Sequence, residues 1–131
     1  MTPLQQFASI LRKAQLENID NIYMNNIPEE QMDDVDLTIA LAQGVRVDPT
    51  RFGSNDFFGV ANEVELQIFY KKDLDFDTSQ LELRIMKLLT HNDWKPVNIE
   101  DHALDPDTQQ EYITMYFRNN QTLNEKGEII K

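Results

Sequence analysis

The chain has 131 residues, no cysteine and a formal net charge of −11, with 12 Lys or Arg against 23 Asp or Glu. This length predicts one domain, the missing cysteines exclude disulfides and thiol catalysis, and the acidic balance argues against specific nucleic-acid binding because it repels phosphate backbones. No stretch approaches the roughly 20 apolar residues of a membrane span and no secretory leader is evident, so we expect no membrane partner and folding in the cytoplasm.

The first predicted element is a helix that begins at Thr2-Pro3 and ends near residues 17–18. Threonine is a favoured N-cap, and proline fits the first helical position because its missing N–H would have no partner there. A short extended piece follows at residues 20–27, and residues 29–34 are predicted to form a turn or one loose helical turn.

The middle of the chain predicts two strands. Residues 35–47 are rich in branched side chains and are predicted to form a strand, in which Gly44 marks a bulge or a bend. Residues 48–56 are dense in turn formers and are predicted as a loop, and residues 57–72 form the strongest predicted strand. One face of that strand is apolar: Val64, Leu66, Ile68 and Tyr70.

The last part of the chain predicts a second helix over residues 79–91. Two antiparallel strands are predicted to follow at 94–104 and 111–118, joined by the turn-forming sequence Asp-Pro-Asp-Thr at 105–108. Strands in runs with only two helices predict an α+β fold, with a mainly antiparallel sheet of four to five strands flanked by two helices. We expect a single domain over residues 1–118 and a flexible polar tail over 119–131.

Three aspartates alternate directly after the strongest predicted strand: Asp73, Asp75 and Asp77. An EF-hand loop begins this way, but it needs glycine at its sixth position and glutamate at its twelfth, where this chain has Thr78 and Arg84. Asp77 instead suits the N-cap of the second helix, with Gln80 three residues later as a capping-box partner. We therefore expect a joint between strand and helix rather than a metal site.

Other polar groups suggest no catalytic centre. His102 stands beside Glu100 and Asp101, but no nucleophile motif accompanies it, and His91 suits the last turn of the second helix. Glycine-rich phosphate loops are absent. A further acidic group reads as a solvated loop: Glu29, Glu30, Asp33, Asp34 and Asp36. We expect a protein that is not an enzyme, with no catalytic, metal or cofactor-binding residue.

Two stretches are candidates for a protein interface. The glycine-bounded segment 51–59 carries residue types that dominate interface hot spots: Arg51, Phe52, Asp56, Phe57 and Phe58. These phenylalanines can equally fold back onto the core. In the second helix, Leu83 and Met86 widen the apolar stripe beyond the roughly 100° that packing on one sheet requires. That arc fits a helix buried on two sides and fits a helix that meets another subunit.

Three segments in this order carry a resemblance: VELQIFYKKDLDFD (64–77), LELRIMKLLTHNDW (81–94) and HALDPDTQQEYITMYF (102–117). Together they resemble a family of small, poorly characterised proteins from the tail-gene region of siphophages of Gram-positive bacteria. The order of elements is also similar to that of phage tail terminators and tail-completion proteins.

The resemblance implies a structural role in virion assembly and a tail-terminator-like fold. It implies a homo-oligomeric ring, commonly a hexamer, at the head-proximal end of the tail tube. The expected partners are the chain itself, the tail tube protein and the head–tail connector protein, and the expected location is the tail or neck of the virion. Three alternatives stay open: a head–tail connector component, a divalent-metal-binding module that uses the aspartate run, and an acidic inhibitor of a host nucleic-acid-binding protein.

Overall fold

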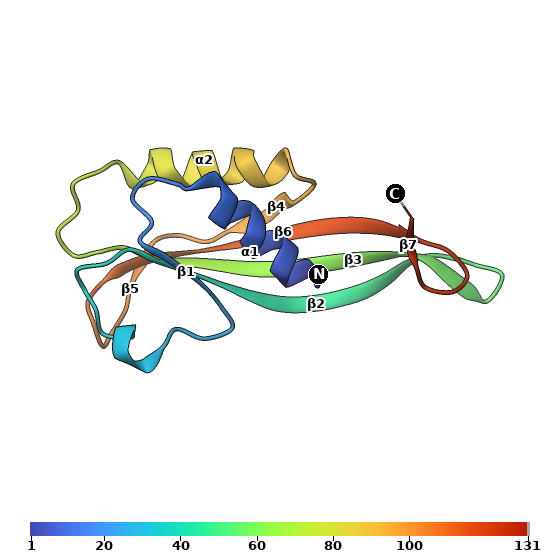
Figure 1. The fold of residues 1–131 in the computed structure, drawn as a ribbon, viewed down its shortest axis with the longest axis horizontal. Coiled ribbons are helices and arrows are strands. Elements are labelled where there is room, and N and C mark those ends of the chain that lie inside the picture. The colour runs from blue at the N-terminus through green and yellow to red at the C-terminus, as the bar shows by residue number, and fades with distance from the viewer. Residues whose placement is uncertain (131) are drawn as a thin grey trace.

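Two helices lie over one face of a long, twisted sheet in the computed structural model, which describes residues 1–130 (Figure 1). The helices are α1 (Pro3–Ala14) and α2 (Thr78–Thr90), and a short 3-10 helix, η1, spans Glu29–Gln31. The strands are β1 (Asn21–Met24), β2 (Ile39–Gly53), β3 (Asp56–Phe69), β4 (Lys95–Ile99), β5 (Ala103–Leu104), β6 (Glu111–Leu123) and β7 (Ile129–Ile130).

The strands of the described residues form one mixed, 7-stranded sheet in the order β1-β2-β3-β6-β4, with β5 and β7 also paired to β6. β1 runs parallel to β2, and the other pairs are antiparallel. The predicted tail-terminator-like sheet of four to five mainly antiparallel strands is therefore wrong, although the broad α+β class holds. β5 and β7 have 2 residues each, which is too short for alternation to be read from sequence.

The core lies between the helices and the sheet. The predicted apolar face of β3 is confirmed, because Leu66 and Ile68 are fully buried beneath the helices. From α1, Phe7 packs edge to face on Trp94 with ring centroids 5.1 Å apart. Burying a side chain of this size contributes about 1.5–3 kcal/mol, so these residues fix how the helices sit on the sheet.

Both helices begin where the sequence predicts. Thr2 caps α1 in a capping box with Gln5, and Asp77 caps α2 by accepting a 3.2 Å hydrogen bond from the backbone N–H of Gln80. α1 ends at Ala14, earlier than predicted, because Gln15 takes a left-handed conformation with φ 49° and its N–H bonds to Arg12.

The predicted loop over residues 48–56 is wrong. β2 continues to Gly53 and β3 begins at Asp56, so only Ser54 and Asn55 form the turn, both with positive φ. Two-residue hairpin turns favour such conformations because they match the twist of the strands. The predicted bulge is confirmed by a register shift between Gly44 and Arg46.

The predicted domain boundary at residue 118 falls inside β6, which continues to Leu123. Its last residues then pair with β7, with Thr122 opposite Ile130 and Leu123 opposite Ile129. Residues 119–130 thus extend the sheet, where the sequence predicted a polar tail.

Candidate protein interface

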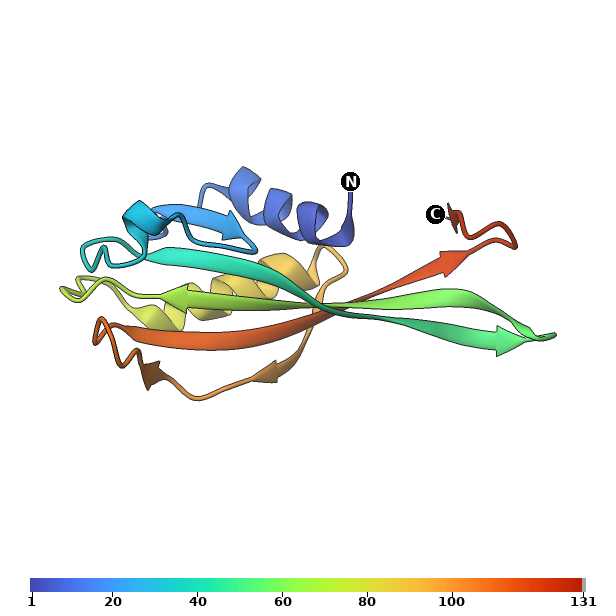
Figure 2. The same ribbon diagram turned by 90° about the horizontal axis from the view of Figure 1, so that it is seen from below.

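The sheet projects beyond its helices as a ribbon, which we call the arm: residues 43–62 of β2 and β3 with residues 119–130 of β6 and β7 (Figure 2). β1 leaves β2 after the pair Met24–Ala42, and β4 pairs with β6 no further than the pair Lys95–Arg118. The N-terminal end of α1 reaches the base of the arm, where Pro3 and Leu4 line one hollow with residues 44–47 and Asn62. Beyond this base, the ribbon in Figure 2 runs clear of both helices.

A polar network braces the neck of the arm. Arg118 of β6 bonds Asp48 of β2 at 3.0 Å across the intervening β3, and its Nε lies 3.0 Å from Glu63 of β3 as an ion pair without hydrogen-bond geometry. Asn119 donates to the carbonyl of Asp93 at 3.0 Å, which ties the arm to the body. Joining three strands and the body in this way limits bending at the neck.

Two aromatic side chains stand at the tip of the arm. Phe52 is 74% exposed and Phe57 is 38% exposed, and they face each other across the hairpin with ring centroids 6.3 Å apart. Phe58 is half-buried, and Asp56 is exposed beside the turn. The two facing phenylalanines thus point to solvent rather than back to the core.

Arg51 holds the tip in register by reaching across β3 to β6. Its side chain donates a 2.7 Å hydrogen bond to the hydroxyl of Thr122, and its backbone has a positive φ of 56°. The path passes over Gly59, where an added Cβ would lie 2.5 Å from the Thr50 hydroxyl and 3.0 Å from Arg51. Gly59 is therefore required for this close approach.

The arm leaves apolar groups and a strand edge uncovered. The outer edge of β2 beyond Gln43 has no neighbouring strand in the described residues, and Val47 beside it is 65% exposed. A hollow of about 470 Å³ lies on the other flank, between the body at Trp94 and the segment Ile129–Ile130. An open edge with apolar side chains is a template for pairing with another chain.

A family model matches residues 1–122 of the chain. The chain belongs to the family described as Protein of unknown function (DUF806). The matched region includes both helices, the whole β2–β3 hairpin and nearly all of β6. The β2–β3 hairpin of the arm therefore lies within the matched region, whereas β7 lies beyond it. No curated protein matches the chain.

The aspartate run of this DUF806 chain forms a joint. Asp77 caps α2, and Asp75 pairs with Lys71 at 3.0 Å. Within residues 1–130, no group of three or more histidine, aspartate or glutamate side chains is arranged to hold a metal ion. Within the same residues, no helix has the length and apolar character needed to cross a membrane.

His102 lies in a cluster of polar side chains that come from distant parts of the sequence. Its Nε2 lies 3.1 Å from Glu82 Oε1 on α2, and its Nδ1 bonds Glu111 on β6. The ring stacks on Tyr70 with centroids 6.0 Å apart, and the Tyr70 hydroxyl donates a 2.5 Å hydrogen bond to Glu82. Glu100 and Asp101, which stand beside His102 in the sequence, make none of these contacts. The residues that do contact His102 are 9 to 32 positions away in the chain, so no local sequence pattern could have indicated the cluster.

The electrostatics of this cluster favour a protonated imidazole. Burial lowers the pKa of His102, but its hydrogen bonds to Glu111 and Glu82 outweigh that effect and raise the pKa above its usual value. Burial and then the bond to Glu82 raise the pKa of Tyr70 far above its usual range, which keeps its hydroxyl a donor. These contacts join Glu82 of α2, Tyr70 directly after β3 and Glu111 of β6, and we call the cluster the clamp.

The two interface candidates on α2 differ in exposure. Leu83 is 54% exposed, whereas Met86 is half-buried and packs against the core. Both lie on the body, away from the tip of the arm (Figures 1 and 2). The predicted interface residues therefore fall on two separate surfaces.

Proposed function

We propose that this DUF806 chain is a structural subunit of phage virion assembly, a tail terminator or tail-completion protein that forms a ring at the head-proximal end of the tail tube. The observation that carries the proposal is the arm, whose aromatic tip and open strand edge have no partner within the described residues. The resemblance of residues 64–117 to siphophage tail-region proteins supplies the setting.

In this account the arm binds the tail tube protein, and the body makes the contacts between subunits. Exposed phenylalanines on a braced ribbon are suited to insert between subunits of another assembly, because aromatic anchors carry much of the binding energy of interfaces. The neck network supports this role, since a stiff arm loses little conformational entropy on binding. The strongly acidic chain also suits a ring through which DNA passes without being held.

The test is binding to isolated tail tubes, with the wild-type chain compared with the double substitution Phe52→Ser and Phe57→Ser. Wild type is expected to cap tube ends in electron micrographs, and the double variant to lose at least tenfold in affinity. Val97→Ser is the matched control, because Val97 is an exposed apolar side chain on β4 of the body. Equal binding by all three proteins would remove the arm from the contact, and binding to portal-side proteins in preference to tubes would indicate a head–tail connector component instead.

A further inference from the structure

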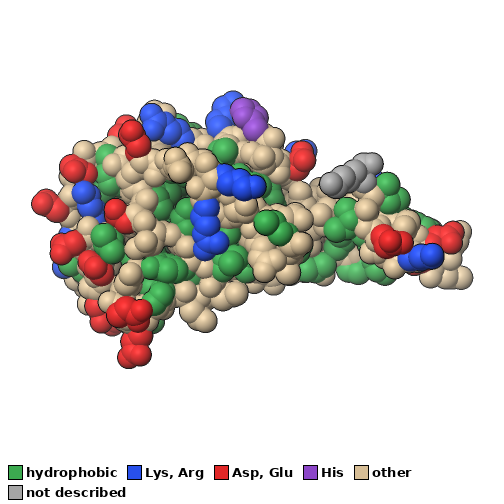
Figure 3. Space-filling view, viewed as in Figure 1, with side chains coloured by type: hydrophobic (Ala, Val, Ile, Leu, Met, Phe, Trp, Pro, Cys, Tyr) green, Lys and Arg blue, Asp and Glu red, His purple; other side chains and the backbone are tan. Residues whose placement is uncertain are grey.

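The surface of the helical layer differs in charge from the rest of the chain. The two helices carry basic side chains that are exposed, Arg12, Lys13, Arg84 and Lys87, while their one acidic residue, Glu82, is buried in the clamp with Tyr70 and His102. Figure 3 shows Lys and Arg over the helices, whereas Asp and Glu dominate the loops at the far end of the body. In a chain with a net charge of −11, this is a local positive surface.

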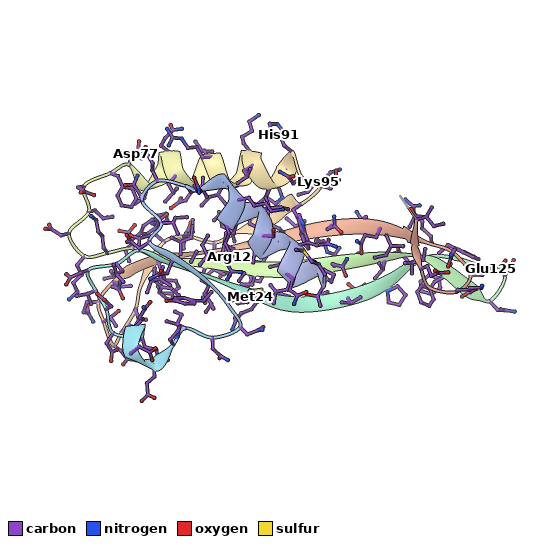
Figure 4. The ribbon with its side chains drawn as sticks, in the orientation of Figure 1. Arg12, Met24, Asp77, His91, Lys95 and Glu125 are labelled. Atoms are coloured by element: carbon purple, nitrogen blue, oxygen red, sulfur yellow. The ribbon has the colours of Figure 1, made fainter. Side chains whose placement is uncertain are left out.

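We define the helix face as Lys13, Leu83, Arg84 and Lys87. Leu83 and Lys87 lie four residues apart and Arg84 and Lys87 three apart, so these side chains share the outward side of α2. Lys13 of α1 lines one hollow of about 350 Å³ with Leu88 of α2, which follows Lys87 directly and lies four residues from Arg84. His91 and Lys95 lie near the end of α2 (Figure 4).

Acidic side chains cluster at the end of the sheet where β2 begins, β3 ends and β6 begins. The pairs Ile39–Phe69 and Phe69–Tyr112 place these three strand ends side by side, so the loops 25–38, 70–77 and 105–110 meet at one end of the sheet. The Lys72 N–H bonds the Val35 carbonyl at 2.9 Å and joins two of these loops. We call this surface the acidic end. Apart from Asp77, which caps α2, it carries nine carboxylates against two lysines: Glu29, Glu30, Asp33, Asp34, Asp36, Asp73, Asp75, Asp105 and Asp107 against Lys71 and Lys72.

Each surface also carries exposed apolar side chains. Leu83 is 54% exposed on the helix face, and Met32 and Leu74 are 58% and 40% exposed at the acidic end. Paired surfaces with apolar groups among opposite charges match the make-up of protein interfaces, in which charge complementarity sets the partner and the register. The net charge does not prevent such a contact, because salt screens charges beyond about 8 Å at physiological ionic strength.

We propose that the helix face binds the acidic end of a second copy of this chain. The two surfaces differ, so the contact is head-to-tail, and repetition of a head-to-tail contact generates a ring when the rotation closes. This proposal rests on the proposed function and names the contact between its subunits. It leaves the arm free for the tail tube.

The test reverses the charge of each surface in turn. The first variant is Arg84→Glu with Lys87→Glu, and the second is Asp36→Lys with Asp73→Lys; all four residues are exposed. The control is Arg46→Glu with Lys126→Glu, two exposed residues of the arm, which changes net charge as the first variant does but lies outside both surfaces. Circular dichroism and thermal unfolding establish that each variant is folded, and Leu83→Ser provides an uncharged test of the helix face.

Sedimentation velocity then measures assembly at physiological salt. Wild type and the control are expected to assemble, and each reversed variant alone to associate at least tenfold more weakly. An equal mixture of the two reversed variants is expected to assemble again, because each altered surface then meets a complementary one.

Three results would overturn the contact: a wild-type chain that stays monomeric, a reversed variant that assembles like wild type, or a mixture that does not recover. Binding of the wild-type chain to tube ends is measured as well, so that failure of the subunit contact can be told apart from failure of the proposed function. If the first variant assembles normally and wild type still caps tubes, the contact is wrong and the function stands. If wild type neither assembles nor binds tubes, both are wrong.

Discussion

Phe52 and Phe57 face each other as the antiparallel pair next to the closing pair of the hairpin, Gly53–Asp56, and both side chains are exposed. An aromatic pair adds about 0.5–1.5 kcal/mol beyond its area burial, so replacing both exposed residues with serine is expected to cost at most about 1.5 kcal/mol of unfolding free energy. Urea denaturation measures the loss. Phe7→Ala is the contrasting core variant and is expected to cost about 3–5 kcal/mol; a similar loss for the tip variant would mean that the tip contributes to folding.

The close approach at Gly59 gives a second prediction. Gly59→Ala is expected to cost about 1–3 kcal/mol, because the new methyl group would force Thr50 and Arg51 to move. Gly53→Ala is the matched control, since a Cβ there meets nothing within 4 Å. The difference between the two midpoints of urea unfolding checks this. If the two variants unfold alike, the path of Arg51 to Thr122 does not depend on Gly59.

The clamp at His102 predicts how stability depends on pH. The folded protein raises the pKa of His102, so its contribution is fully present below the unfolded value of about 6.5 and is lost as pH rises through the folded pKa. Stability should therefore fall as pH is raised from 6 through this range. The His102→Gln variant should lack this part of the pH dependence in chemical denaturation, whereas the exposed His91→Gln should retain it; identical profiles for all three proteins would rule out the clamp as its source.

The buried end of the same clamp can be tested through Tyr70. Removing its hydroxyl with Tyr70→Phe takes a donor from Glu82, which is 7% exposed. A buried acceptor that loses a partner costs about 1–3 kcal/mol, and this loss is the expected change in unfolding free energy. Tyr112→Phe serves as control, since Tyr112 is half-buried and its hydroxyl makes no hydrogen bond within the described residues. Equal stability of the two variants would mean that the Tyr70 bond contributes nothing.

The aspartate run between β3 and α2 is expected to stabilise the protein through the helix cap at Asp77 and without a bound metal ion. Asp77→Ala should cost about 1 kcal/mol, the usual value of an N-cap, while Asp75→Ala should change stability by less than about 0.5 kcal/mol, because it removes only an exposed ion pair. Thermal unfolding with and without EDTA checks both points. A melting temperature that falls on adding EDTA would contradict the joint.

Regular periodicity made the central strand and both helices predictable. The alternation from Val64 to Tyr70 and the capping residues Thr2 and Asp77 are local signals, and each led to the right element. The sequence predicted a loop over residues 48–56, where the structure has the strands of the arm, because Pro49 and Gly53 are residue types that favour turns. Pro49 is tolerated there because the outer edge of β2 is unpaired, so its missing N–H breaks no bond to a further strand.

Groups that depend on tertiary contact could not be predicted. Glu82 and Glu111 reach His102 from another helix and another strand, and no sequence spacing marks them. Leu83 looked like part of a wide core stripe, and only the structure separates its exposed side chain from the half-buried Met86. The parallel pairing of β1 with β2 likewise depends on a crossing of residues 25–38 that no local pattern specifies.

The most direct test of the assembly account is the mass of the chain in solution by light scattering, over a wide concentration range, alone and mixed with tail tube protein. The account predicts a ring-sized mass, about six times that of one chain for the expected hexamer, unchanged by EDTA. A mass of one chain at every concentration, both alone and with the tube protein, would contradict it.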